Sequence, residues 1–162
     1  MTRPSTLTIE HLVTALAGRP APELIGAAAG IEIKDAVVDS RRAGPGSLFV
    51  ALRGQHHDGH DFIPQAVAAG AVAVLAERCP PDIESLVLPA GDGPPQALKA
   101  GPGQPVCLVV PDSLAALQQV AAHWRRQHDV RVIGVTGSVG KTTSKEVIAA
   151  VLKQRYGCLK SE

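Results

Sequence analysis

Aromatic residues, excess charge and long apolar runs are all scarce in this sequence. With two Phe, one Trp and one Tyr in 162 residues, a packed core must consist of Val, Leu, Ile and Ala, which suits a sheet covered by Ala-rich helices. The formal net charge is +1, so no basic excess marks a nucleic-acid or membrane-surface binder. No apolar run reaches the roughly 20 residues that span a bilayer. We therefore expect neither a nucleic-acid partner nor membrane insertion.

Cysteine is also scarce. Cys79, Cys107 and Cys158 are odd in number and far apart in the sequence, so we expect them to be reduced and to serve as small apolar side chains. The first residues, MTRPSTLTIEHLV, show neither the apolar stretch nor the cleavage site of a secretory signal. Together these features predict a cytoplasmic protein.

Apolar runs and helical spacing alternate along the chain, which is typical of an α/β fold with mostly parallel strands. Helical patterns occupy 8–17, 62–69, 112–124 and 141–155, and strand patterns occupy 31–38, 47–52, 71–76, 85–88, 106–110 and 131–135. The residues expected to face inward in the last two helices are Leu114, Leu117, Val120, Ala121, Trp124, Val147, Ile148, Val151 and Leu152. Residues 89–105, rich in Gly and Pro, are predicted to form a flexible loop.

The segment VIGVTGSVGKTTSKE, residues 132–146, has the context that a phosphate-binding loop requires: an apolar strand, a Gly-rich turn, then a helix. Gly137 and Gly140 lack side chains, so backbone N–H groups can close around an anion. The helix that begins near Lys141 directs its positive end at the same place. We also expect a change of domain near Pro111, which divides the chain into residues 1–111 and 112–162.

Each residue of this loop has a predicted role in binding ATP. Lys141, the predicted catalytic residue, would hold the β and γ phosphates, and the hydroxyl of Thr142 would bind Mg²⁺. The ATP-binding residues expected from the motif are Gly137, Ser138, Val139, Gly140, Lys141, Thr142 and Thr143. The motif departs from the usual pattern at Val135, where a Gly is common. The alternative is a Gly-rich turn without a ligand.

Residues 39–77, DSRRAGPGSLFVALRGQHHDGHDFIPQAVAAGAVAVLAE, closely resemble the N-terminal domain of the Mur ligases, which build peptidoglycan precursors. The resemblance lies in a DSR turn, a PG, a strand like LFVAL, the DGHDFI stretch and an Ala-rich helix ending in GA. It implies that this domain binds the UDP end of the substrate through Ser40, Arg41, Gln55 and His56. The alternative for DSRR is a surface turn in which Asp39 accepts backbone N–H bonds and the arginines are solvated.

The HHDGHD stretch contains metal-ligand residue types, but it lacks a distant fourth ligand, so we do not predict a metal site there. We expect Asp58 and Gly59 to turn the chain and Asp61 to cap the helix that carries Phe62. By resemblance, the fold is a substrate domain over residues 1–111, followed at 112–162 by the first strand, P-loop and helix of an ATPase domain.

The resemblance also implies a reaction. The form GSVGKTTSKE is similar to that of family members that add D-alanyl-D-alanine to UDP-N-acetylmuramoyl tripeptide. Such ligases use ATP and Mg²⁺ and proceed through an acyl phosphate, so the expected partners are the UDP-N-acetylmuramoyl peptide, ATP and D-alanyl-D-alanine. We expect this chain by itself to be catalytically inert. The alternatives are the ligase that adds the third peptide residue, a UDP-precursor-binding module without catalysis, and an unrelated P-loop kinase or GTPase.

Overall fold

The structure is a computed structural model that describes residues 6–88 and 103–161. Most of the Gly- and Pro-rich segment predicted to be a flexible loop lies outside the described residues. The chain forms two compact units, Met1–His128 and Asp129–Glu162. This division falls after the helix that follows Asp112, whereas the predicted boundary lies before it.

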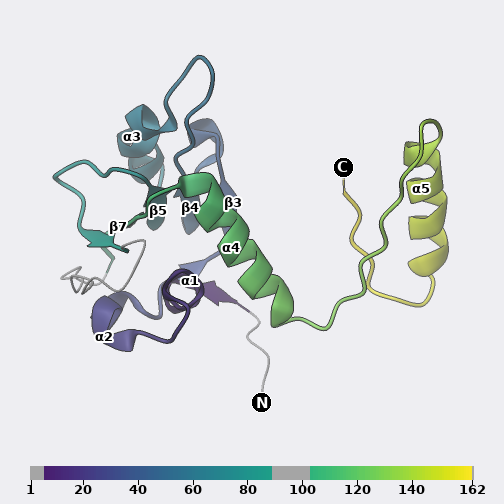
Figure 1. Cartoon of the computed structure of the whole chain (residues 1–162), viewed down its shortest axis with the longest axis horizontal. Helices are drawn as coiled ribbons and strands as arrows, with labels where there is room; N and C mark the ends of the chain where they lie inside the picture. Colours follow the sequence, from purple (N-terminus) through teal and green to yellow (C-terminus); the bar gives the residue numbers. More distant parts are fainter. Residues whose placement is uncertain (1–5, 89–102, 162) are drawn as a thin grey trace. The chain divides into compact units, whose positions relative to one another are not determined.

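The first unit is built around a parallel sheet. Its five strands are ordered β3 (Asp35–Val37), β4 (Ser47–Val50), β5 (Ala73–Ala76), β7 (Val106–Val109) and β6 (Ser85–Val87), and every pairing is parallel. The α/β fold with parallel strands that the sequence predicted is therefore present (Figure 1).

The strand predicted at 31–38 is two short strands. β2 (Glu32–Ile33) pairs antiparallel with β1 (Leu7–Thr8) in a separate two-stranded sheet, and β3 begins after Lys34. The N–H of Lys34 donates to the carbonyl of Gly46 at 2.9 Å. The single-strand prediction was wrong because the apolar pattern does not show that the chain changes pairing partner at this residue.

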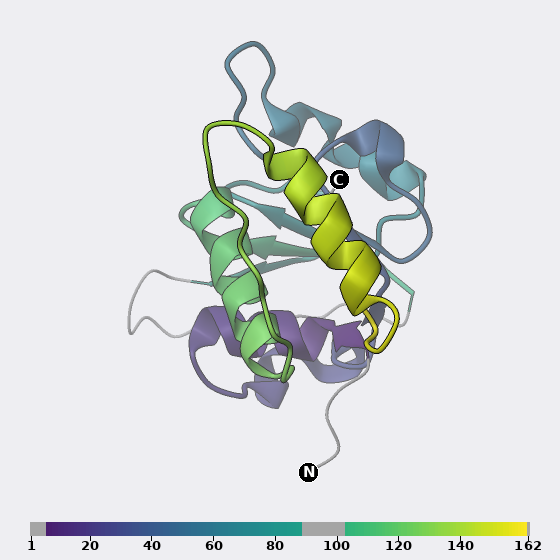
Figure 2. The ribbon, with the colours of Figure 1, turned by 90° about the vertical axis from the view of Figure 1, so that its right-hand side faces the viewer.

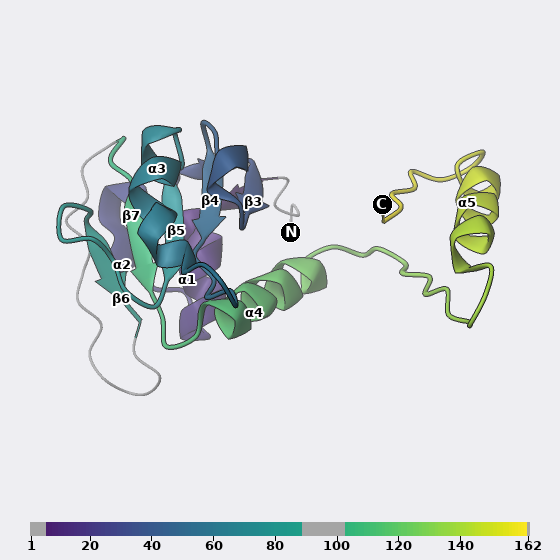
Figure 3. The same ribbon diagram turned by 90° about the horizontal axis from the view of Figure 1, so that it is seen from above.

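Alternate strand residues face two different cores. Leu48, Val50, Leu75 and Leu108 belong to one cluster, and Phe49, Val74 and Cys107 on the same strands belong to the other. The first cluster includes residues of α1 (Ile9–Ala17), α2 (Pro22–Ile25) and α4 (Ser113–Arg126), and the second includes residues of α3 (Ile63–Ala68). The sheet is thus covered by helices on both faces (Figures 1 and 3).

Helix α4 belongs to the first unit and packs against α1. Asp112 caps it as predicted, with Oδ1 accepting the N–H of Ala115 at 2.9 Å. The amide of Gln119 donates to the carbonyl of Ala15 in α1 at 2.8 Å. The predicted inward face was partly wrong, since Leu114 is 51% exposed and Ala121 is exposed. The buried stripe runs through Ser113, Ala116 and the predicted Val120, because the short α1 meets α4 on that side.

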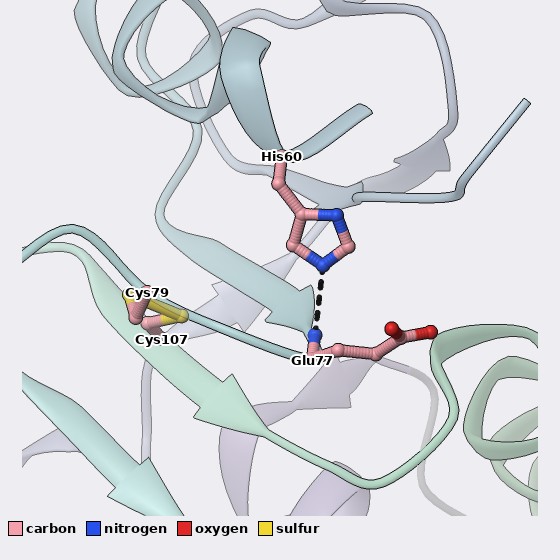
Figure 4. Close-up of a disulfide and its surroundings, with 4 residues drawn as sticks. All are labelled: His60, Glu77, Cys79 and Cys107. Carbon is pink, nitrogen blue, oxygen red and sulfur yellow. Dashed lines mark hydrogen bonds between the residues drawn. A yellow bond between two sulfur atoms is a disulfide. The ribbon is translucent and has the colours of Figure 1, made fainter. Parts of the chain in front are cut away.

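Two cysteines are joined in a disulfide, which corrects the prediction that they are reduced (Figure 4). Cys107 is fully buried in β7, and Cys79 lies shortly after β5. The parallel pairing of β5 with β7 brings together two residues 28 apart in the chain. Sequence spacing does not reveal that pairing. Cys158 remains free.

Within residues 129–161, the second unit contains one helix, α5 (Lys141–Leu152), beside an extended segment. Arg131, Ile133 and Val135 share a small cavity with Ile148 and Leu152 of α5, so the segment runs alongside the helix (Figure 2). The strand predicted at 131–135 is not formed, because no other strand lies within the described part of this unit to pair with it. Val147, Ile148 and Val151, predicted to face inward, are 57%, 36% and 62% exposed.

Candidate nucleotide and substrate sites

A cavity of about 600 Å³ opens at the carboxyl ends of β3 and β4. It is lined by Val38, Asp39, Ser40, Arg41, Phe49, Leu52, Gly54, His57, Gly59, Phe62 and Gln65. Open parallel sheets bind ligands at this edge, because the loops that leave the strands converge there. The structure therefore places the predicted Ser40 and Arg41 in a ligand-sized cavity.

The DSR turn forms a short 3-10 helix, Ser40–Arg42, directly after β3. Asp39 accepts the backbone N–H of Arg41 at 3.0 Å and also binds its guanidinium, with Nη2 to Oδ2 at 2.6 Å. The side-chain hydrogen bonds from Arg41 lower the pKa of Asp39 to about 2. The capped turn of the alternative interpretation is present, but Arg41 is paired with Asp39 rather than freely solvated. Arg41 is still one of the residues that line the cavity.

Ser40 is buried, and its hydroxyl donates to Oε1 of Gln65 at 2.9 Å. Because that proton is used, the oxygen of Ser40 acts as an acceptor toward the cavity, while the amide nitrogen of Gln65 retains two donors. Gln65 belongs to α3 and was not predicted as a site residue. No local motif marks it, since only the folding of α3 over the sheet brings it to the cavity.

The loop after β4 contributes His57, whose ring contacts Phe62 edge-on with centroids 6.4 Å apart. Both residues line the cavity. Gln55 and His56, predicted from the resemblance, are exposed and lie outside the residues that line it.

The DGHDF stretch holds this loop against the sheet. Asp58 accepts the N–H of His60 at 3.0 Å and begins the 3-10 helix η3 (Gly59–Phe62). Asp61 does not cap α3 as predicted; the residue before α3 is Phe62, which makes no side-chain capping bond. The cap moves to Asp58 because the 3-10 turn precedes the α-helix, so the unpaired N–H groups appear three residues earlier.

The predicted phosphate-binding loop lies in the second unit and is open. Gly140 ends it with φ 77°, a conformation that favours Gly, and α5 begins at the next residue. The first helical bond of α5 joins the N–H of Ser144 to the carbonyl of Gly140 at 2.9 Å. The N–H groups of Lys141, Thr142 and Thr143 precede that bond, so they have no carbonyl within the helix and point toward the loop.

The loop side chains are exposed, with Val139 at 90%. The ammonium of Lys141 folds over the loop and donates to the carbonyl of Gly137. Ser138, Val139 and Gly140 are likewise exposed. The structure thus gathers the seven predicted ATP-binding residues in one accessible turn. The Thr142 hydroxyl, in the first turn of α5, is an oxygen ligand suited to Mg²⁺.

Comparison with known proteins gives the family. The profile described as "Mur ligase family, catalytic domain" matches residues 32–125. The chain belongs to the Mur ligase family. Over 76% of its length, this Mur ligase sequence is 47% identical to the UDP-N-acetylmuramoyl-tripeptide–D-alanyl-D-alanine ligase of Synechocystis sp..

Solved Mur ligases share the fold. MurF from Acinetobacter baumannii superposes with a TM-score of 0.66 at 30% identity, covering 95% of this chain and 29% of that one. MurF from Thermotoga maritima, solved in complex with ADP, superposes with a TM-score of 0.53 at 32% identity. The match covers 75% of this chain and 23% of the Thermotoga chain. This Mur ligase chain spans only 23% of the Synechocystis relative.

Within residues 6–88 and 103–161, no group of three or more His, Cys, Asp or Glu side chains could hold a metal ion. None of the helices described there is long and apolar enough to cross a membrane.

Proposed function

We propose that this Mur ligase chain is part of an ATP-dependent amide ligase that adds D-alanyl-D-alanine to UDP-N-acetylmuramoyl tripeptide. The observation that carries the proposal is the open GSVGKTT turn at the N-terminus of α5, in a chain that also has a cavity at the carboxyl edge of its sheet. The 47% identity to a ligase of that name supports the choice of substrate. The proposed setting is the cytoplasm, where ATP and UDP-linked precursors are available.

The first unit would bind the UDP end of the precursor. Arg41 supplies a guanidinium that suits a pyrophosphate, and Ser40 presents an acceptor oxygen. Gln55 and His56 lie on the neighbouring loop and remain proposed contacts for parts of the precursor that extend beyond the cavity. The negative charge of Asp39 opposes an anion here, so Arg41 must turn from Asp39 toward the phosphates or contact both.

The loop of the second unit would bind ATP. The amides of residues 137–143 and the ammonium of Lys141 offset the charge of the phosphates while the γ-phosphoryl moves to the terminal carboxylate of the tripeptide. Thr142 would hold Mg²⁺, which screens phosphate charge during the transfer. The acyl phosphate formed on the substrate is then attacked by the amine of D-alanyl-D-alanine, and phosphate leaves.

Replacing Lys141 tests the nucleotide half of the proposal. Lys141→Ala removes the charge that faces the phosphates, so we expect the Kd for Mg-ATP, measured by calorimetry, to rise at least about tenfold. Lys153→Ala, at the C-terminal end of the same helix, is the matched control and should bind Mg-ATP like the wild type. Equal affinities of all three proteins would show that the loop does not bind ATP as proposed.

A second candidate is a module that binds the UDP precursor without catalysis. It is favoured by the absence of a strand at 131–135, since the loop then lacks the sheet that usually supports it. Calorimetry separates the two functions: the module binds UDP-N-acetylmuramoyl tripeptide but not Mg-ATP. ADP release from this chain with all substrates should not exceed that of Lys141→Ala under either function.

A further inference from the structure

His60 is a buried histidine whose two ring nitrogens are both engaged. Its side chain is 1% exposed, and Nδ1 lies 2.5 Å from Oδ1 of Asp58. The backbone N–H of Glu77 donates to Nε2 at 3.0 Å (Figure 4). Since a backbone N–H can only donate, Nε2 is the acceptor and the ring proton is on Nδ1, directed at Asp58.

The Glu77 N–H that donates to His60 belongs to the three residues that follow β5, and contacts of these residues hold it in place. The carboxylate of Glu77 pairs with Arg53 at 2.9 Å. The next residue, Arg78, binds Oδ2 of Asp58 at 2.9 Å. Cys79 is joined to Cys107 in the centre of β7. Residues 77–79 therefore form an anchor, each member of which is tied to the loop after β4 or to the sheet.

His60 connects this anchor to the candidate substrate cavity. It lies in η3 between Gly59 and Phe62, which both line the cavity, whereas His60 is not among the lining residues and its ring reaches Glu77. We infer that His60 is a positioning residue for the UDP-precursor cavity, and that it acts through the bond from Glu77 N–H to Nε2. The inference rests on the proposed function of that cavity.

The hydrogen bond at Nε2 is harder to replace than the one at Nδ1, because the partner of Nδ1 has other hydrogen-bond donors. Asp58 also accepts the backbone N–H of His60 and the guanidinium of Arg78, so it stays attached when the imidazole is lost. The part-buried N–H of Glu77 has Nε2 as its acceptor, and a donor shielded from water costs free energy when that partner is lost. Losing Nε2 would leave that N–H without its acceptor and loosen η3 where Gly59 and Phe62 line the cavity, while the bond from Gly59 to Leu52 still holds the start of η3.

Two substitutions that introduce a side-chain amide distinguish the role of Nε2 from the role of Nδ1. In His60→Gln the side-chain oxygen reaches about as far as Nε2 and can accept from Glu77, whereas in His60→Asn the amide reaches only about as far as Nδ1 and can contact Asp58. The probe is UDP-N-acetylmuramoyl tripeptide, titrated by calorimetry into the full chain. We expect His60→Asn to raise its Kd at least about tenfold, and His60→Gln to stay within about threefold of the wild type.

A stability control separates positioning from unfolding. Val13→Ala truncates a fully buried residue of α1 in the other core cluster. All variants are titrated at a temperature where circular dichroism shows them folded, and Val13→Ala should keep the wild-type Kd. If His60→Gln binds no better than His60→Asn, or if both bind like the wild type, the inference is wrong. If the wild-type chain does not bind the precursor, the proposed function itself fails.

Discussion

Among the described glycines of the first unit, Gly59 is the one where an added Cβ would lie closest to another atom. Its N–H donates to the carbonyl of Leu52 at 2.8 Å, so η3 lies directly on the end of the strand segment. A Cβ at this position would lie 2.6 Å from the carbonyl oxygen of Leu52 and 2.7 Å from its nitrogen. Both are backbone atoms, so the chain itself would have to shift to make room. The glycine in the DGHDF stretch is therefore required by packing.

Gly59→Ala should lower the free energy of unfolding by about 1–3 kcal/mol, because the chain must shift to admit the methyl group. Urea denaturation measures the change. Gly30→Ala is the control, since a Cβ there meets nothing within 4 Å. Equal stability of the two variants would show that the contact with Leu52 relaxes without cost.

Asp58 makes stability depend on acidity. Hydrogen bonds from the N–H and then the ring of His60 lower its pKa from 3.8 to about 2. A carboxyl with a depressed folded-state pKa stabilises the fold above its unfolded pKa, and that contribution disappears as the pH falls through the folded pKa. The urea midpoint of the wild type should therefore fall between pH 3.8 and about 2.

Asp58→Asn removes this titration, so its urea midpoint should fall less over the same interval. Both proteins also contain Asp39, whose pKa is likewise lowered to about 2, so the comparison isolates Asp58. Parallel decline of the two midpoints would contradict the assignment.

At the scale of elements, the disulfide holds β7 to the segment after β5. It closes a loop with a sequence separation of 28 residues. Restricting a loop of that size in the unfolded chain stabilises the fold by about 3–4 kcal/mol in the chain-entropy description.

Adding dithiothreitol should therefore lower the wild-type free energy of unfolding by about 3–4 kcal/mol. The doubly substituted Cys79→Ala, Cys107→Ala chain should not respond to the reductant, and Cys158→Ala should respond like the wild type. A wild-type protein indifferent to reductant would mean that the pair contributes no stability.

Sequence patterns located most elements because their signals are local. Thr8 and Gly18 bound α1, Asp112 caps α4, and the buried strands are short apolar runs between turn residues. The errors arose where tertiary partners decide the outcome. The break at Lys34, the stripe of α4 and the missing strand at 131–135 each depend on which neighbour is present.

The residues of the candidate sites also fall into those that a local motif predicts and those that tertiary packing brings in. The contiguous GSVGKTT motif places its residues in one turn, and the DSR turn lies at the cavity, because each is a local structure following a strand. Gln65 of α3 and Phe62 of η3 line the same cavity, and His60 of η3 bonds to Glu77 beside it. Their participation depends on packing between elements, which one sequence read by local pattern does not reveal.

At the scale of the whole molecule, the two units differ in how well their apolar surfaces are covered. Leu75, Leu86 and Leu108 in the sheet are 1% exposed or less, whereas Val147 and Val151 of α5 are more than half exposed. Regions with few buried apolar contacts open more readily.

Amide hydrogen exchange should therefore be faster in α5 than in β5 and β7, by roughly 100-fold or more. Mass spectrometry of peptides covering residues 147–152 and 73–76 measures the difference in a dilute sample. Similar protection of both peptides would show that the apolar face of α5 is covered in solution. Repeating the measurement at several protein concentrations then tells whether a second copy provides the cover.

Because Cys79 and Cys107 are bonded to each other, Cys158 offers the single reactive thiol of this chain. It lies beside Ile148 and Leu159 in the small cavity along α5. A maleimide fluorophore would therefore attach at one known position, in the unit that carries the GSVGKTT turn. Its emission would report events around α5, and binding at the sheet cavity could be followed independently.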